Sequence, residues 1–223
     1  KDMRILTKVD MLMLEMLANC NWERPLYMAI SVGEVSKLKF DHYFVQEGLA
    51  FRFTPFDYKK WGNVKGDNNY AIDVERLYEN VMNRYKYGGL DETTLRTCYY
   101  HRRLFAQLAK ELIRQGDNTR ARKVLAYAEQ AVPAYNVPEI YESGSFDIAK
   151  AYAALGEKTK AMPLLKYLTA ESENYINWAF SLGDNRINMV QRDCLYKFWQ
   201  WNQYNELVKE IDEEEYRLSN QRF

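Results

Sequence analysis

The stretch that decides the fold of this chain runs from His101 to Pro133 and reads HRRLFAQLAKELIRQGDNTRARKVLAYAEQAVP. Apolar residues at helical spacing flank Gly116, which predicts two antiparallel helices joined by a turn where glycine adopts a left-handed conformation. Small side chains let two helices approach closely, and large side chains fill the seam between them. The residues expected in these roles are Phe105, Leu108, Ala109, Ala121, Leu125, Ala128 and Pro133.

A second stretch, from Phe146 to Leu165, repeats this arrangement around Gly156 and reads FDIAKAYAALGEKTKAMPLL. Both stretches resemble the tetratricopeptide repeat, in which helix pairs stack into an array that presents a surface to a partner. The two turn glycines are 40 residues apart, against the usual ~34, because the loop at 135–143 is long. The matching positions in the second stretch are Ile148, Ala149, Tyr152, Ala161 and Leu165.

A small α/β portion is predicted before the repeats, over residues 1–65. The segment Thr7–Cys20 is apolar nearly all round, so we expect a buried helix whose methionines fill the core. Short apolar runs at Leu26–Ser31 and Leu49–Thr54 predict two strands that pair with each other and pack on that helix. Residues Asp41–Gln46 are expected to form one or two helical turns.

Residues 66–92 are expected to connect the α/β portion to a helical repeat domain at 93–223. A loop at 57–69, rich in Gly, Asn and Lys, is the best candidate linker. Asp73 is the expected N-cap of the helix that follows, and Gly88-Gly89 is its expected end. In the second repeat, Pro163 requires its helix to start late, near Met162, or to kink. Further helices are predicted at 175–182, 188–203 and 204–219. The predicted fold is therefore mainly α, with tetratricopeptide-like helical repeats preceded by a small α/β portion.

The composition argues against several kinds of site. The formal net charge is +0, so no long-range field attracts nucleic acid or an anionic membrane. The three cysteines, Cys20, Cys98 and Cys194, are too widely spaced for a disulfide framework, and we expect buried free thiols. His42 and His101 have no second ligand at metal spacing, so neither a metal nor another cofactor is predicted.

The candidate binding surface lies on the first helix of each pair. There Arg103, Lys110, Arg114 and Lys150 are expected to point toward the inner face of the repeats. Such a surface suits an acidic peptide or the C-terminal carboxylate of a partner protein. The alternative is that these are ordinary solvated cations, paired with acids of the chain such as Asp147.

A second candidate is an aromatic cluster near the C-terminus, formed by Tyr196, Phe198, Trp199, Trp201 and Tyr204. Exposed rings at this density can stack on sugars, but helical spacing favours packing into a capping core. Arg24, beside Trp22, with Glu23 and Glu47 is a further possible site. Its alternative is that Arg24 ties the helix end to the strand through backbone carbonyls. No catalytic motif for phosphate or dinucleotide binding or for acyl transfer is present.

Three segments resemble one family of bacterial multi-pass membrane proteins of unassigned function. They are NWERPLYMAI at Asn21–Ile30, VQEGLAFRFTP at Val45–Pro55 and YGGLD at Tyr87–Asp91. That family is distantly similar to protein O-mannosyltransferases, which use a lipid-linked sugar donor. The resemblance implies an extracytoplasmic, periplasmic region that follows the last helix of an inner-membrane protein. The catalytic acid of such enzymes lies in the membrane part, so no catalytic residue is carried over.

The expected function is therefore a non-catalytic extracytoplasmic scaffold of a membrane-anchored protein, which docks a protein, peptide or glycan partner. The chain begins at Lys1 without methionine, and we read it as a fragment that reaches the membrane only through an upstream region. One alternative is an accessory part of a glycosyltransferase whose active site lies in that upstream region. The other is a free-standing soluble adaptor. In each case the isolated chain is not expected to be an enzyme.

Overall fold

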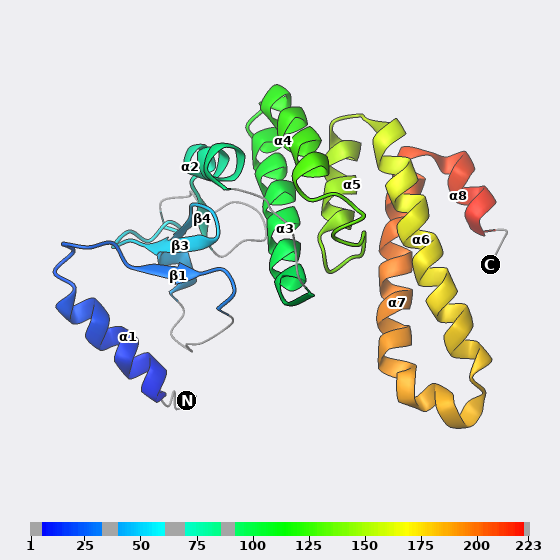
Figure 1. The fold of residues 1–223 in the computed structure, drawn as a ribbon, viewed down its shortest axis with the longest axis horizontal. Helices are drawn as coiled ribbons and strands as arrows, with labels where there is room; N and C mark the ends of the chain where they lie inside the picture. The colour runs from blue at the N-terminus through cyan, green and yellow to red at the C-terminus, as the bar shows by residue number, and fades with distance from the viewer. Residues whose placement is uncertain (1–5, 33–39, 61–69, 86–91, 221–223) are drawn as a thin grey trace. The chain divides into compact units, whose positions relative to one another are not determined.

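A computed structural model describes residues 6–32, 40–60, 70–85 and 92–220 (Figure 1). The chain divides into two compact units, Lys1–Lys86 and Tyr87–Phe223. The first holds a small sheet with short helices and the second is helical, so the fold is mainly α with a small α/β portion, as predicted. Most of the expected linker at 57–69 and the helix end at Gly88-Gly89 lie outside the described residues.

The sheet of the first unit contains β1 (Tyr27–Ala29), β2 (Phe44–Gln46), β3 (Ala50–Phe53) and β4 (Ala71–Ile72), in the order β1-β3-β2-β4. β3 pairs antiparallel with both β1 and β2, and β4 runs parallel to β2. The two predicted strands are confirmed as a pair, with Met28 opposite Phe51. Helical turns were expected over 41–46, and this is correct only for η1 (Asp41–Tyr43). The other half is strand β2, which is buried and pairs with a neighbouring strand on each side.

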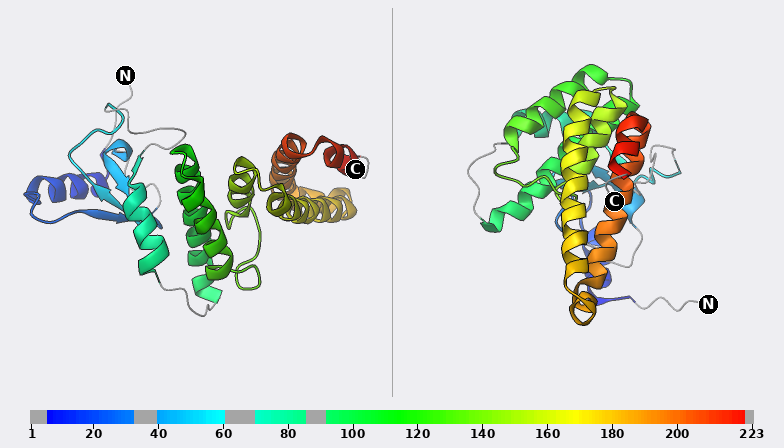
Figure 2. Two further views of the ribbon diagram at one scale, coloured as in Figure 1. Left: turned by 90° about the horizontal axis from the view of Figure 1, so that it is seen from above. Right: turned by 90° about the vertical axis from the view of Figure 1, so that its right-hand side faces the viewer.

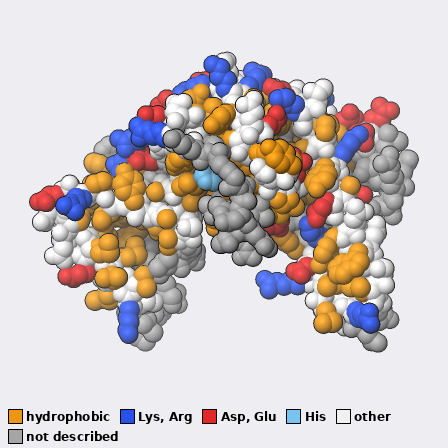
Figure 3. Space-filling model, viewed as in Figure 1, with side chains coloured by type: hydrophobic (Ala, Val, Ile, Leu, Met, Phe, Trp, Pro, Cys, Tyr) orange, Lys and Arg blue, Asp and Glu red, His pale blue; other side chains and the backbone are white. Residues whose placement is uncertain are grey.

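Helix α1 (Lys8–Asn19) forms where it was predicted, and Thr7 and Asp10 close a capping box at its start. Its predicted burial and its packing as part of the core are wrong. Met11, Leu12 and Met16 are 56%, 60% and 51% exposed, and Figure 3 shows apolar side chains over this helix. An apolar helix is buried only where another element covers it, and within the described residues of the first unit none covers these side chains.

Helix α2 (Val74–Glu79) continues into η2 (Asn80–Arg84), a π-helical turn. The predicted N-cap is confirmed, because the Asp73 side chain accepts a hydrogen bond from the Arg76 amide at 3.1 Å. π-helical turns are rare and are frequently found at functional sites. This one ends at Arg84 and leads directly into Tyr85.

The second unit contains α3 (Glu92–Arg114), α4 (Asn118–Ala131), α5 (Ser145–Ala154), α6 (Lys158–Ser181), α7 (Asp184–Ile211) and α8 (Glu213–Asn220). Successive helices pack in pairs, α3 with α4, α5 with α6 and α6 with α7 (Figures 1 and 2), and α3 also packs on α5. Gly116 and Gly156 adopt φ angles of 84° and 74° at the two predicted turns. This left-handed conformation is the reason for glycine there.

The residues predicted for the helix–helix seams are largely buried. Phe105, Leu108, Ala109, Ala121, Leu125, Ala149, Ala161 and Leu165 are each fully buried, while Ala128, Ile148 and Tyr152 are buried with a small exposed remainder. Pro133 is half-buried in the turn that follows α4. Buried alanines where two helices meet leave little room for larger side chains. The assignment to the tetratricopeptide class itself stays a prediction.

The late start expected for the second helix of the second repeat is wrong, since α6 begins at Lys158 and contains Pro163. The amides of the first helical turn have no partner within the helix in any case. Pro163 lies just beyond that turn, so it removes only one internal hydrogen bond. Of the helices predicted at 175–182, 188–203 and 204–219, the end of the first is confirmed, since α6 ends at Ser181 and α7 begins at Asp184. The breaks predicted before 175 and between 203 and 204 are wrong. α6 runs unbroken through 171–175 and α7 through 203–204. The two helices bury Ile176 and Ala179 of α6 against Cys194 of α7. None of the described helices is long and apolar enough to cross a membrane.

Candidate functional site

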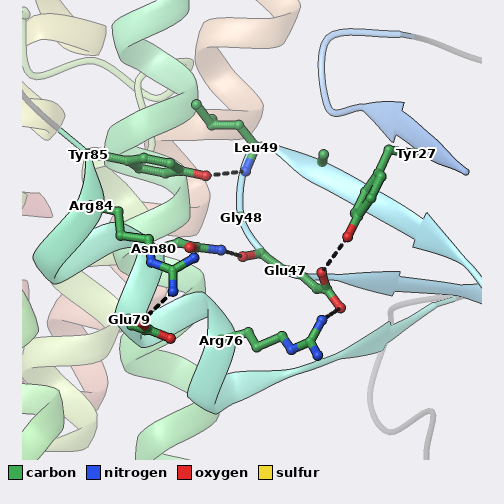
Figure 4. A pocket seen from close by; sticks show the side chains of 10 residues that line it. Tyr27, Glu47, Gly48, Leu49, Arg76, Glu79, Asn80, Arg84 and Tyr85 are labelled. Atoms are coloured by element: carbon green, nitrogen blue, oxygen red, sulfur yellow. Dashed lines mark hydrogen bonds and ion pairs between the residues drawn. The ribbon is translucent and has the colours of Figure 1, made fainter. Parts of the chain in front are cut away.

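The first unit contains a polar cavity of about 510 Å³ between the sheet and the α2–η2 helix (Figure 4). We call it the Glu47 pocket, after the buried carboxylate on its floor. The strand ends supply Tyr27, Glu47 and Gly48, and the helix supplies Arg76 and Arg84. Its walls therefore carry charged and phenolic groups, and its size lies within the range of about 300–1,000 Å³ typical of small-molecule sites.

The Glu47 carboxylate is held by three side chains. Its Oε1 accepts hydrogen bonds from Arg52 Nε at 2.6 Å and Arg76 Nη1 at 2.8 Å, and its Oε2 accepts one from the Tyr27 hydroxyl at 3.3 Å. The hydrogen bond to Glu47 raises the pKa of the Arg52 guanidinium. Two guanidiniums on one oxygen compensate the cost of burying this charge.

The turn after Glu47 is clamped by the π-helical segment. Asn80 Nδ2 donates to the Glu47 carbonyl at 2.6 Å, and the Leu49 amide donates to the Tyr85 hydroxyl at 2.9 Å. A Cβ on Gly48, whose φ is 156°, would lie 2.2 Å from that hydroxyl, so a larger residue requires Tyr85 to move. The backbone of the pocket is thus held in place independently of any ligand.

A second candidate lies on three alternate helices of the second unit, α3, α5 and α7. Burial raises the pKa of Tyr141. Its ring centroid lies 6.0 Å from that of Phe146 on α5 and 6.2 Å from that of Tyr196 on α7, and the nearby Gly144 packs against Arg103 of α3. The Tyr141 ring is 5.4 Å from that of Trp199, measured between centroids. We call this region the α3–α5–α7 surface.

The four predicted cations differ in their surroundings. Arg114 Nε bonds Glu111 at 2.8 Å and Lys150 Nζ lies 2.5 Å from Asp147, so acids of the chain neutralise both. Arg103 and Lys110 are exposed on α3, and among the described residues no carboxylate lies within ion-pair distance of either. They are seven residues apart, close to two full turns, so they share one face of the helix.

The capping-core expectation for the C-terminal aromatics is correct for part of the set. Tyr204 is fully buried, and Phe198 and Trp201 pack on the core around Ile176. Tyr196 and Trp199 remain 43% and 46% exposed and stack with their ring centroids 5.8 Å apart. They lie three positions apart, on the side of α7 that is turned away from α6.

Sequence reasoning missed Arg102, a guanidinium that is only 6% exposed. Burial lowers its pKa. Its five hydrogen bonds are to the carbonyls of Val132, Val137 and Pro138, at 2.9, 2.7 and 2.8 Å, and to the hydroxyls of Ser143 and Ser145, at 2.9 and 3.2 Å. Arg102 therefore closes the long loop between the two helix pairs. A signal was present, because Arg102 lies three and seven positions before Phe105 and Ala109, on the apolar face of α3.

Glu47 does not take part in the site suggested around Arg24, because it binds Arg52 and Arg76. Glu23 and Arg24 instead line a separate cavity of about 310 Å³ beside the end of α1. Arg24 is exposed and makes no hydrogen bond to a described residue, so it does not tie the helix to the strand through carbonyls either. The cysteines are free thiols, with Cys98 and Cys194 buried and Cys20 partly exposed. Within the described ranges, no group of three or more His, Cys, Asp or Glu side chains is arranged to hold a metal ion.

The fold and its sites define a small charged α/β unit linked in sequence to a helical unit with a mixed cationic and aromatic surface. Residues 2–75 match the family model described as TMEM260-associated domain 2. The match contains two of the segments quoted above, Asn21–Ile30 and Val45–Pro55, and fits a TMEM260-related family, which points to a membrane-protein-related domain. Comparisons with curated proteins and with solved structures gave no match.

Proposed function

We propose that this chain is a non-catalytic, extracytoplasmic scaffold of a membrane-anchored protein, and that it docks an acidic segment of a partner protein on the α3–α5–α7 surface. The observation that carries this proposal is the pair of exposed cations, Arg103 and Lys110, which have no carboxylate at ion-pair distance among the described residues. The match at residues 2–75 supports the association with a membrane protein. The exposed apolar side chains of α1 suit contact with another part of a larger assembly.

The chemistry of the surface favours carboxylates and flat side chains in the partner. A guanidinium binds a carboxylate through two parallel hydrogen bonds, which makes Arg103 the more specific of the two cations. The exposed Tyr196–Trp199 stack offers apolar area to a neighbouring segment. Lys150 and Arg114, already paired with Asp147 and Glu111, add little free charge.

The expected binding is weak and sensitive to salt, because exposed charge pairs contribute about 0–1 kcal/mol each and are screened beyond about 10 Å at 0.1 M salt. The test is a titration of a fluorescent, glutamate-rich peptide into the wild-type protein and into Arg103→Ala/Lys110→Ala. The matched control is Arg24→Ala/Lys123→Ala, which removes the same two charge types from exposed positions in the first unit and on α4. We expect the control to bind like wild type and the α3 variant to bind at least fivefold more weakly. Equal affinities for the two variants would contradict the proposal.

The second candidate function is an accessory part of a glycosyltransferase similar to protein O-mannosyltransferases, whose active site lies in an upstream membrane region. The Glu47 pocket favours it, since Glu47 lies inside the segment matched at residues 2–75. Several upstream membrane helices, with an acidic residue in the first external loop, would support this candidate. A single upstream signal peptide would instead support a free-standing adaptor. Under either proposal the purified chain does not turn over a lipid-linked or nucleotide sugar, and turnover would contradict both.

A further inference from the structure

The Glu47 pocket has a balanced set of charges. Glu47 is paired with Arg52 and Arg76, Glu79 with Arg84 at 2.6 Å, and Asp73 lies 3.6 Å from Arg76. Of these, two carboxylates and two guanidiniums line the pocket itself, Glu47 and Glu79 with Arg76 and Arg84. An anion in the pocket is attracted by Arg76 and Arg84 but repelled by Glu47 and Glu79. A cation is attracted by the two glutamates but repelled by the two arginines. The charges of the pocket therefore favour neither an anionic nor a cationic ligand.

Alternating donors and acceptors suit hydroxyl groups. A guanidinium has five N–H donors and a carboxylate accepts from several directions, so Arg84 and Glu79 keep unused capacity beyond the single bond between them. The Arg76 and Arg84 side chains are more than half exposed. A hydroxyl can accept from one such guanidinium and donate to the adjacent carboxylate at the same time. Neighbouring hydroxyls on a rigid ring match neighbouring pairs of this kind.

The pocket also offers a flat apolar surface. The Tyr27 side chain belongs to β1 and is 53% exposed, with its hydroxyl directed at Glu47 (Figure 4). An aromatic face beside charged hydrogen-bonding groups suits a ligand with an apolar face and a polar rim. Leu49 and Ala50 add apolar lining at the same edge.

The geometry is set before any ligand arrives. The π-helical turn places Asn80 and Tyr85 against the backbone of the turn after Glu47, and Gly48 permits the close approach of Tyr85. Binding therefore does not require ordering of the pocket backbone, which lowers the entropy cost of association. Such a built pocket differs from a chance depression between surface side chains.

We propose that the Glu47 pocket binds one neutral sugar unit, a free hexose or the terminal unit of a glycan. Glu79 and Arg84 bind its hydroxyls, Arg76 and Glu47 form the floor, and Tyr27 covers one face of the ring. The site uses residues of the first unit only. A negative result for peptide binding at the α3–α5–α7 surface would therefore leave this proposal untouched, and a negative result for sugar binding would leave the peptide proposal untouched.

The test uses the full chain with D-glucose, D-galactose and D-mannose as probes, at concentrations up to tens of millimolar. Saturation-transfer NMR detects the bound sugar, and amide shifts of Gly48 and Leu49 locate it. We expect saturable millimolar binding of at least one hexose. Inorganic phosphate and D-glucuronate test the charge argument and are expected to bind no more tightly than that hexose.

Two variants and one control test the residues. Tyr27→Ala and Arg84→Gln should each weaken hexose binding at least fivefold, while Phe56→Ala, a similarly exposed aromatic of the same unit outside the pocket lining, should bind like wild type. Tyr27→Ala decides the outcome if Arg84→Gln fails to fold, which circular dichroism reports. Absence of saturable binding of all three hexoses, tighter binding of phosphate, or equal affinities for Tyr27→Ala and Phe56→Ala would each overturn the proposal.

Discussion

Replacement of Arg102 by methionine tests whether this buried guanidinium holds the long loop of the second unit. Methionine keeps most of the apolar length of the side chain and removes all five hydrogen bonds. The carbonyls of Val132 and Val137 lose a charged donor in buried surroundings. The Pro138 carbonyl is only partly buried, so water can replace its partner.

The expected loss follows from these contacts. Each buried carbonyl left without a donor costs about 1–3 kcal/mol, or about 2–6 kcal/mol for the two. Ser143 and Ser145 lose less, because their hydroxyl oxygens lie 3.0 Å apart and bond to each other. Removing a buried charge also returns part of its desolvation cost, which is several kcal/mol. The net destabilisation of Arg102→Met should be about 2–4 kcal/mol.

The matched control is Arg103→Met, the same substitution at the adjacent, exposed position. It should change stability by no more than about 0.5 kcal/mol. Urea unfolding followed by far-ultraviolet circular dichroism measures both variants, and limited proteolysis within residues 132–144 reports on the loop itself. Faster cleavage is expected only in Arg102→Met. A loss below about 1 kcal/mol, or equal losses in the two variants, would refute the assignment of Arg102 as the residue that holds the loop.

Three further predictions concern a seam alanine, two turn glycines and a buried histidine. Ala121→Leu inserts a large side chain at a fully buried position and should cost about 1–3 kcal/mol in thermal unfolding; a wild-type melting curve would contradict the helix-pair alignment. Gly144→Ala should cost more than Gly116→Ala, because both glycines have φ near 85° but only at Gly144 does a new Cβ approach Arg103 Cγ, at 2.7 Å; Gly116→Ala carries the left-handed penalty alone, about 1–2 kcal/mol. Burial lowers the pKa of His101, so the unfolded chain binds a proton at this side chain more readily than the folded protein does. The free energy of unfolding should therefore decline as pH falls below about 6.5. Urea titrations at several pH values should show a smaller decline in His101→Gln, and an unchanged decline would contradict this prediction.

The elements that sequence predicted well are those set by local spacing. The helix pairs around Gly116 and Gly156 follow from apolar periodicity and from a glycine that the left-handed turn requires. The N-cap at Asp73 depends on contacts three residues away along the chain. The pairing of β1 with β3 also followed from two short apolar runs, although their exact lengths did not.

The long helices show where local spacing stops being sufficient. The break predicted after 182 exists, at Leu182-Gly183. The breaks predicted before 175 and at 203–204 follow weak points in the apolar pattern, but there α6 and α7 continue because each covers the other around Ile176 and Cys194. In the same way, the spacing of α1 describes an apolar helix and says nothing about what covers it. Burial of a helix depends on its neighbours, and these are set by the tertiary arrangement.

By itself the sequence determined the two helix pairs, where they turn, the strands β1 and β3, and which alanines lie in the seams, because these depend on neighbours within a few residues. Only the tertiary structure decided which charged groups form the sites. Glu47 meets Arg76 across 29 residues, and Arg102 meets Ser145 across 43. Partners so distant leave no periodic trace in the sequence, and the energy of burying a charge depends on which groups the fold brings around it.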